Sequence, residues 1–416
     1  MRLLLLLGLL SVSVYAEPKE IASSLTLEQT VDAALRDNAQ LRSMRAMWEA
    51  AKEKPIQERT LPNPMLAVKN QNGVDNFNFP STQETRVEIE QSFPWPGKLG
   101  LKGKIAEKDA AAAEYDYEAM RREVVMMVKE TYFDLYSVQQ VLTITRADLE
   151  LLKRMAQIAE TMYSTGERTQ TDVLKAQTEI TMLQQKLLEY EQQEATLKAK
   201  LNQLLNRPAD SPLGLAVTTP PVEVEVRDGA ARPEIKKAEA ELQRSRYERD
   251  LMQKESWPDY RVGLEYGHMN AGFSDFSNSE NVLMLTFGID LPIWQSKYRA
   301  GVRQAEKMIE AGQAELEAAQ QQTTFDARDA RFKLQTARQS LDLYRKQLIP
   351  QAKARYESSE AGYRTGKVDF MDLLESQRFL LSARVMAAMA EGNVGMQAAR
   401  LERAVGTVLP KAEEKK

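Results

Sequence analysis

The side chains that carry most enzyme chemistry are nearly absent from this chain. It contains one histidine, His268, and no cysteine, so Ser-His-Asp arrangements, Cys-His arrangements and thiolate metal sites have almost no residues to use. There is also no Gly-rich phosphate loop, no dinucleotide fingerprint and no His/Cys zinc spacing. Asp and Glu number 60 in 416 residues, and no pair of them stands out as catalytic. The sequence therefore predicts a protein that is not an enzyme and uses no cofactor.

The 18 methionines are the second group with chemical potential, because thioethers are good ligands for Cu(I). Met126, Met127, Met386 and Met389 lie in segments with helical periodicity, where methionine usually fills gaps in a core. His268 ends an expected strand beside a long loop, so a surface position is favoured over a metal ligand. We therefore expect no resident metal site.

A fifteen-residue segment occurs twice, 200 residues apart, at 163–177 and 363–377. Both copies read Tyr-x-Thr-Gly-x5-Asp-x-Leu-x2-Gln. Such a repeat predicts two copies of one structural unit packed about a pseudo-symmetric axis. Gly166 and Gly366 interrupt long helical patterns, and the residues that follow supply candidate N-caps for returning helices, namely Thr169, Thr171 and Asp369.

The two copies span residues 17–206 and 232–407, joined by a Pro-rich connector at 207–231. Residues 1–16 have a positive start, an apolar core and a small-residue end, which predicts a cleaved secretory signal peptide. Residues 408–416 form a charged tail that we expect to be disordered. The net charge of −4 gives no electrostatic footprint for nucleic acid.

Each copy is expected to contain a helix, two strands around a long loop, and two long helices around a turn. The four strands, at about 65–70, 85–93, 260–268 and 281–291, alternate apolar and polar residues. Strands of this length could cross a bilayer when tilted or form an ordinary half-buried sheet. Each second strand ends at a proline corner, Phe93-Pro94-Trp95-Pro96 or Leu291-Pro292.

The long helices are expected at about 103–163 and 297–363, with Pro350 as their one proline. Apolar residues recur every seven positions along them, which predicts coiled-coil packing. Sixty helical residues extend roughly 90 Å. An earlier helix is expected from Leu27 through Trp48, and a corresponding helix opens at Arg232-Pro233-Glu234.

Taken together, the tip repeat, Arg232-Pro233-Glu234 and the two proline corners resemble the outer membrane efflux protein family, of which TolC is the namesake. The resemblance covers nearly all of residues 25–407, although the family's Asn-Pro-Glu at the first helical start reads Asn38-Ala39-Gln40 here. It implies a mainly α fold with a small membrane β portion: a homotrimer with a twelve-stranded β-barrel, continued by a long periplasmic α-helical barrel. Lipid would meet Val87, Ile89, Val262, Leu264, Leu283, Leu285 and Phe287; the lumen would hold Glu88, Glu90, Arg261 and Glu265.

The resemblance further implies a functional tip at the two helix turns. There a periplasmic adaptor (membrane fusion) protein would dock, and the matching turn residues are Thr165, Gly166, Thr365 and Gly366. The pore would narrow to rings of acidic side chains, matched by Asp172, Asp372 and Glu375, with Lys175 in the place of Glu375 in the first copy. A ring of carboxylates favours cations. Each acid could also be a first-turn carboxylate stabilised by the helix dipole.

These implications predict a passive exit duct of a tripartite efflux system in a Gram-negative outer membrane, extending into the periplasm. Its energy would come from an inner-membrane pump, expected to be of the resistance-nodulation-division type. The segment Phe93–Lys98 is similar to channels of heavy-metal pumps, so metal cations are a candidate cargo. The alternatives are a soluble periplasmic coiled-coil adaptor and a type I protein secretion channel. Two strand pairs and two helical hairpins favour the duct over the adaptor.

Overall fold

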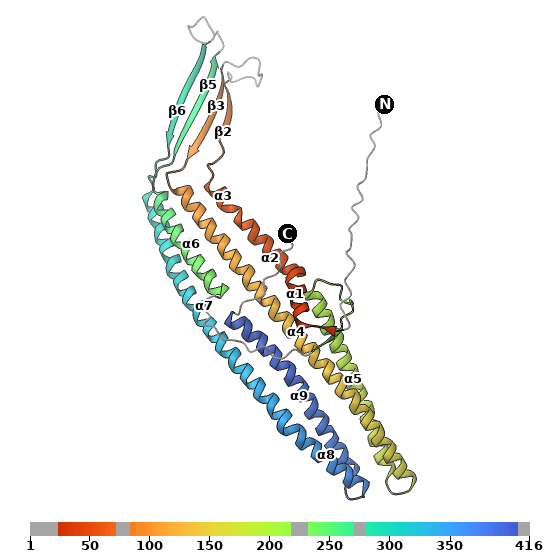
Figure 1. Ribbon diagram of the computed structural model, residues 1–416. Coiled ribbons are helices and arrows are strands. Elements are labelled where there is room, and N and C mark those ends of the chain that lie inside the picture. The colour runs from red at the N-terminus through yellow and green to blue at the C-terminus, as the bar shows by residue number, and fades with distance from the viewer. Residues whose placement is uncertain (1–23, 72–83, 218–231, 270–279, 407–416) are drawn as a thin grey trace, which may run out of the picture.

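The computed structural model describes residues 24–71, 84–217, 232–269 and 280–406. The expected signal peptide, the charged tail and most of the two long strand-pair loops lie outside these residues. The molecule is elongated, with a small sheet at one end and two helix turns at the other (Figure 1). Long helices connect the two ends, so the sheet and the repeated turns are far apart.

The sheet has four antiparallel strands in the order β2-β3-β5-β6. These are β2 (Met65–Gln71) and β3 (Glu84–Phe93) from the first copy, and β5 (Tyr260–Met269) and β6 (Glu280–Ile289) from the second. The inner pair, β3 and β5, joins the two copies edge to edge. Strands β2 and β6 are the two edges of this sheet.

The first copy continues into α4 (Lys98–Ser164), a single helix of 67 residues that returns as α5 (Gln170–Leu204). Helix α4 begins five residues earlier than expected, directly after the proline corner. It contains no proline, and its length is roughly 100 Å at 1.5 Å per residue. This helix is therefore the axis on which most of the molecule packs.

The corresponding helix of the second copy is not one regular helix, contrary to expectation. It consists of α7 (Gln295–Leu343), a π-helical segment (Tyr344–Leu348) and α8 (Ile349–Arg364), and returns as α9 (Phe370–Val405). Pro350 follows the π segment. Because proline has no N–H and its ring clashes with the carbonyl four residues earlier, the chain widens locally instead of keeping regular α-helical bonds.

The helix expected before β2 is also broken, into α1 (Leu27–Asp37), α2 (Ala39–Lys52) and α3 (Lys54–Arg59). The break lies at Asn38, whose Oδ1 accepts hydrogen bonds from the backbone N–H groups of Gln40 (2.9 Å) and Leu41 (3.1 Å). Asn38 therefore caps α2 and is not part of a continuous helix. The corresponding helix in the second copy is α6 (Pro233–Glu255).

The helices form a curved layer, and different helices make up this layer near the sheet and near the turns (Figure 1). Near the sheet, α4 packs between α2/α3 and α6, and α6 packs on α7. Toward the turns, α4 packs between α5 and α9, and α9 packs on α7 and α8. Four helices therefore lie across the layer at both levels, with α7/α8 always at one edge.

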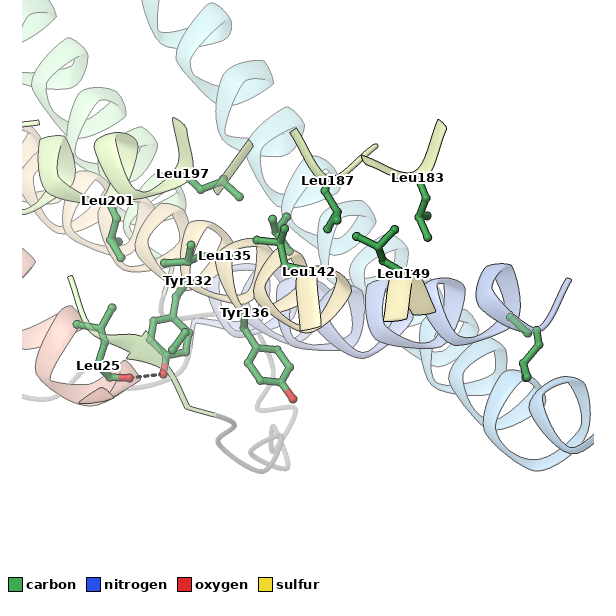
Figure 2. Close-up of a cluster of buried hydrophobic side chains, with 14 of the residues drawn as sticks. Leu25, Tyr132, Leu135, Tyr136, Leu142, Leu149, Leu183, Leu187, Leu197 and Leu201 are labelled. Atoms are coloured by element: carbon green, nitrogen blue, oxygen red, sulfur yellow. Dashed lines mark hydrogen bonds between the residues drawn. The ribbon is translucent and has the colours of Figure 1, made fainter. Parts of the chain in front are cut away.

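Leucines at heptad spacing form the core between α4 and α5 (Figure 2). Leu135, Leu142 and Leu149 of α4 belong to the same buried cluster as Leu187 and Leu201 of α5. Alternate turns of the two helices thus interlock as the sequence period predicts.

Two very short strands were not expected from the sequence. Strand β1 (Ser24–Leu25) pairs in parallel with β4 (Leu215–Ala216), which lies within the predicted connector. The fully buried Tyr132 of α4 holds both strands. Its hydroxyl donates to the Leu25 carbonyl (2.7 Å; Figure 2) and accepts from the Val217 N–H (3.0 Å). The start of the connector is therefore fastened to the middle of the helical layer.

Candidate functional site

The two repeated turns have the same backbone geometry. Gly166 and Gly366 have φ values of +75° and +76°, in the left-handed region that favours glycine. In each turn the residue after glycine donates its N–H to a carbonyl five residues earlier, the bond that closes a Schellman motif. Thr165 and Thr365 donate their hydroxyls to carbonyls at the helix ends. The repeated Thr-Gly thus encodes a helix C-terminus.

The surroundings of the two copies differ. Tyr363 and Leu374 are 1% and 2% exposed, whereas Tyr163 and Leu174 are 46% and 53% exposed. Helix α9 lies between α4 and α8, whereas α5 lies at an edge of the layer. The same repeated residue is therefore core in the second copy and surface in the first.

Arg168 connects the two turns within one chain. Its Nη2 donates to the Val368 carbonyl (3.1 Å) and the Tyr363 carbonyl (3.4 Å), and its guanidinium lies 4.9 Å from the centre of the Tyr363 ring. Burial, followed by the negative charge of Asp172, raises the pKa of Tyr363. The sequence repeat did not reveal this contact, because Val368 replaces arginine in the second copy.

The three predicted constriction acids occupy different environments. Asp172 and Asp372 both lie in the first turn of a helix, α5 and α9 respectively. Asp172 is half-buried, 3.9 Å from Lys175 Nζ, and Glu375 is exposed, 3.3 Å from Arg355 Nη2. Within the described part of the chain, only Asp372 of the three forms no ion pair, and no hydrogen bond or ion pair joins the three acids.

The candidate N-caps behave differently in the two copies. Asp369 accepts a hydrogen bond from the Met371 N–H (2.9 Å), so this prediction is confirmed. Thr169 occupies the N-cap position of α5 but its side chain makes no capping bond. In place of a side-chain cap, the first turn of α5 carries Asp172, whose negative charge interacts favourably with the helix dipole.

A buried acid lies behind the turns, and the sequence reasoning missed it. Asp148 of α4 is 3% exposed and accepts a hydrogen bond from Gln377 Nε2 of α9. Burial raises its pKa to about 7, the positive charge of Arg384 opposes this, and the carboxylate of Glu179 adds to it. The available signal was an acid at helical spacing within the apolar stripe of α4.

At the other end of the molecule, the register of the sheet separates apolar from charged side chains. Ile89, Leu264 and Leu285 lie in one row, and each is at least 45% exposed. On the opposite face Glu88 lies directly across from Glu265, and Arg86 Nη1 is 3.0 Å from Glu265 Oε1. The four predicted strands thus carry one exposed apolar face and one charge-paired face.

An ion pair between a buried lysine and a half-buried aspartate fastens the two copies where sheet meets helix. Lys98 is 2% exposed, and its Nζ lies 2.8 Å from Asp259 Oδ1 and donates to the Trp257 carbonyl (3.1 Å). The same Asp259 oxygen accepts from the Trp95 N–H, and the Trp95 and Trp257 rings stack at 5.0 Å. The proline corner was expected from the sequence, but this cross-copy pair was not.

Among the residues that the structure describes, none of the helices has the length and apolar character needed to cross a bilayer. No group of three or more His, Cys, Asp or Glu side chains there is arranged to hold a metal ion. His268 Nδ1 lies 2.8 Å from Asn281 Oδ1 on the exposed side of the sheet.

Comparison with known proteins is consistent across sequence and fold. The family model described as outer membrane efflux protein matches residues 30–207 and 229–407. The cobalt-zinc-cadmium resistance protein CzcC of Cupriavidus metallidurans is 23% identical, over 94% of this chain and 92% of that protein. The outer membrane protein TolC of Escherichia coli is 22% identical over 92% and 82%.

Solved structures agree with this assignment. CusC has a TM-score of 0.79 at 16% identity, covering 91% of each chain. The outer-membrane channel OprN has a TM-score of 0.76 at 20% identity, covering 91% of this chain and 89% of that one. Because the two matched segments take in both structural copies and most of the chain, this protein belongs to the outer membrane efflux protein family.

Proposed function

We propose that the chain is the outer membrane exit duct of a tripartite efflux system. It passively conducts substrate that an inner-membrane pump expels and that a periplasmic adaptor passes on. The observation that carries the proposal is the combination of a sheet with an exposed apolar face and a helical layer that extends from it to the repeated turns. A nucleotide site is absent from the sequence, so the driving energy belongs to the pump.

The sheet supports a membrane-spanning, trimeric state. Strands β3, β5 and β6 are ten residues each, the length that crosses a bilayer when tilted. Their exposed rows of Ile, Leu and Phe meet lipid, and the Glu88–Glu265 face lines the lumen. Edges β2 and β6 expose backbone donors and acceptors, which a barrel removes. Three copies of four strands close as a twelve-stranded barrel.

The edge helices support the same closure below the membrane. Phe325 and Phe332 of α7 are 63% and 65% exposed, one heptad apart. Leu174 and Leu188 of α5 are also exposed, at the opposite edge of the layer. Helices α4 and α5 of the first copy correspond to α7/α8 and α9 of the second. The packing of α9 on α4 within one chain therefore predicts an equivalent packing of α5 on α8 of the next chain. Repetition of this contact produces a closed α-helical barrel.

The turns at the far end form the periplasmic tip. Thr165, Gly166, Thr365 and Gly366 offer two rigid helix ends of the same shape, suited to repeated docking of an adaptor. In a trimer, Asp372 supplies three carboxylates without ion-pair partners in the described chain, and Glu375 adds three that are paired with Arg355. Asp172 is partly compensated by Lys175. Asp372 is therefore the main source of cation preference in the constriction.

Metal cations are the proposed cargo, with a pump of the resistance-nodulation-division type as partner. The support is the similarity along nearly the whole chain to a protein named for cobalt-zinc-cadmium resistance, together with the acidic tip. Deleting the gene should lower tolerance to cobalt, zinc or cadmium. Unchanged tolerance to all three would remove the metal assignment and leave the duct itself intact.

The first experiment tests the trimer through the internal repeat. Within one chain, Asp148 of α4 contacts Gln377 of α9. The two copies are offset by 200 residues, so the equivalent contact between neighbouring chains would join Leu348 to Gln177. Because the chain has no cysteine, the double variant Gln177→Cys/Leu348→Cys should cross-link between chains in isolated outer membranes with a short bis-maleimide, giving covalent dimers and trimers. Each single variant is the matched control. A water-soluble monomer without cross-links would favour the periplasmic coiled coil.

A further inference from the structure

The two strand-to-helix corners are rich in cations and free of acids. Residues 91–106 and 291–305 contain no Asp or Glu and six Lys or Arg, although the whole chain has 60 acids and a net charge of −4. The cations are Lys98, Lys102, Lys104, Lys297, Arg299 and Arg303. Such a local excess in both copies needs a partner for the positive charge.

Most of these cations have no acidic partner within the described part of the chain. Lys98 is satisfied by Asp259, and Lys104 and Lys297 lie over the rings of Tyr247 and Tyr298 respectively. Lys297, Arg299 and Arg303 are exposed and form no ion pair there. Farther along the same strand-to-turn helix, exposed lysines do have carboxylate partners, at Lys307–Glu310, Lys333–Asp329, Lys346–Asp342 and Lys353–Glu357. Arg328, Arg331 and Arg338 of α7 are also exposed and form no ion pair in the described chain, but they do not follow an apolar segment at the strand end.

The unpaired cations directly follow an exposed apolar segment. Leu291, Ile293 and Trp294 are 69%, 65% and 71% exposed and continue the apolar face of β6. Trp294 is the N-cap residue of α7, and Lys297 follows within one turn. This sequence of apolar residues, tryptophan and cation matches the order of hydrocarbon, interface and phosphate across one side of a bilayer.

A groove provides room for a headgroup beside these cations. It lies between the end of α6 and the start of α7 and has a volume of about 400 Å³. Arg299 and Arg303 line it together with the apolar side chains of Met252 and Val302. Glu306, its one acid, lies about one turn farther from the sheet. The end nearest the sheet therefore combines guanidinium groups with apolar surface.

We propose that Lys297, Arg299 and Arg303, which we name the collar, bind the phosphate of an anionic glycerophospholipid in the leaflet on the helical side of the outer membrane. The inference rests on the proposed membrane position of the sheet. Anionic lipid is the occupant because the collar offers three positive charges that form no ion pair in the described chain. Arginine forms paired hydrogen bonds with phosphate, and each cation near an anionic surface strengthens binding about fivefold.

The test uses the full-length trimer in detergent, titrated with phosphatidylglycerol or phosphatidylcholine of identical chains and followed by native mass spectrometry. The wild type should bind phosphatidylglycerol more tightly. The triple variant Lys297→Gln/Arg299→Gln/Arg303→Gln should lose on the order of 10- to 100-fold of that binding. The matched control removes three paired charges elsewhere: Lys333→Gln/Lys346→Gln/Lys353→Gln. Its lipid preference should equal that of the wild type.

A photoactivatable phosphatidylglycerol in reconstituted bilayers locates the contact, with adducts expected within residues 295–305. Equal affinity for the two lipids, an unaffected collar variant, or adducts only on other segments would overturn the inference. The proposed function has a separate readout, because a protein that fails to insert into bilayers of either lipid refutes the membrane position of the sheet. Insertion without preference for phosphatidylglycerol refutes the collar alone.

Discussion

Replacing Asp148 with asparagine should stabilise the protein in a strongly pH-dependent way. Burial raises the pKa of this carboxyl from 3.8 to about 7. A rise of about three units corresponds to roughly 4 kcal/mol of unfavourable ionisation in the folded state. The sign follows from linkage. Below about pH 4 the Asp148 carboxyl is protonated in both the folded and the unfolded protein, and the contribution of the neutral group to the free energy of unfolding is fully present. That contribution is lost as pH rises to about 7, because only the unfolded chain ionises freely.

Asparagine has the same shape without the charge, so Asp148→Asn should escape this loss. Its amide oxygen still accepts from Gln377 Nε2, and its NH2 group offers a donor to Gln377 Oε1, which has no partner. The surrounding charges remain in place, with Arg384 on α9 and Glu179 on α5. The Tyr356 hydroxyl on α8, whose own pKa is raised to about 12, stays neutral. The expected gain is near zero at pH 4 and up to about 4 kcal/mol at pH 8.

The assay is urea unfolding of the detergent-solubilised protein, followed by circular dichroism at several pH values between 4 and 8. The free-energy difference between Asp148→Asn and wild type should grow with pH. Glu189→Gln, which removes an exposed carboxylate on α5, is the control and should give a flat difference. A difference independent of pH, or a variant less stable than wild type at pH 8, would refute the assignment of Asp148 as a buried, ionisation-sensitive group.

Three further predictions concern the tip and the corner. Asp372→Asn should reduce cation selectivity, measured as the reversal potential of single channels in a salt gradient, by more than Glu375→Gln does; equal reversal potentials for both variants and wild type would exclude the acidic ring. Lys98→Met should destabilise the fold by about 1–3 kcal/mol in urea unfolding, because the hydrogen bonds of Lys98 Nζ to Asp259 and to the Trp257 carbonyl are lost. Gly366→Ala should cost about 1–2 kcal/mol through its positive φ, although a methyl group there has room, whereas Gly100→Ala inside α4 should stabilise slightly.

Much of the element order follows from local signals in the sequence. The strands lie within two residues of their expected bounds, since period-two alternation ends at proline corners. Helix α4 is unbroken, as expected, because no proline interrupts it, although it begins five residues before the expected start. The two errors also have local causes. Apolar periodicity alone places Asn38 inside a helix, whereas its side chain makes it a strong N-cap residue. The effect of Pro350 is a local π segment within a continuing helix.

The contacts of the site depend on tertiary packing and had no such signal. Arg168 reaches a turn 200 residues away, and Asp148 becomes buried only when α9 covers α4. The two-residue strands β1 and β4 are too short for periodicity and form because Tyr132 holds both. The repeat predicts where the two Thr-Gly turns lie in the sequence. Because the repeated residues are of the same type in both copies, it cannot predict that Tyr363 and Leu374 are buried whereas Tyr163 and Leu174 are exposed.

That difference between copies is itself an argument about assembly. Leu374 is core and Leu174 is surface, yet both positions hold leucine in the same motif. Exposure of one apolar side chain is common in folded proteins. Here, however, the exposed copies line an edge helix, and their buried counterparts define the surface that would cover them. In the trimeric ring that we propose, Lys175 in the place of Glu375 would make the two copies unequal in charge. Asp172 of the first copy has Lys175 beside it and Glu375 of the second copy has Arg355, whereas Asp372 has no ion-pair partner in the described chain. In the trimer that we propose, the three Asp372 side chains on α9 would therefore supply most of the negative field at this end.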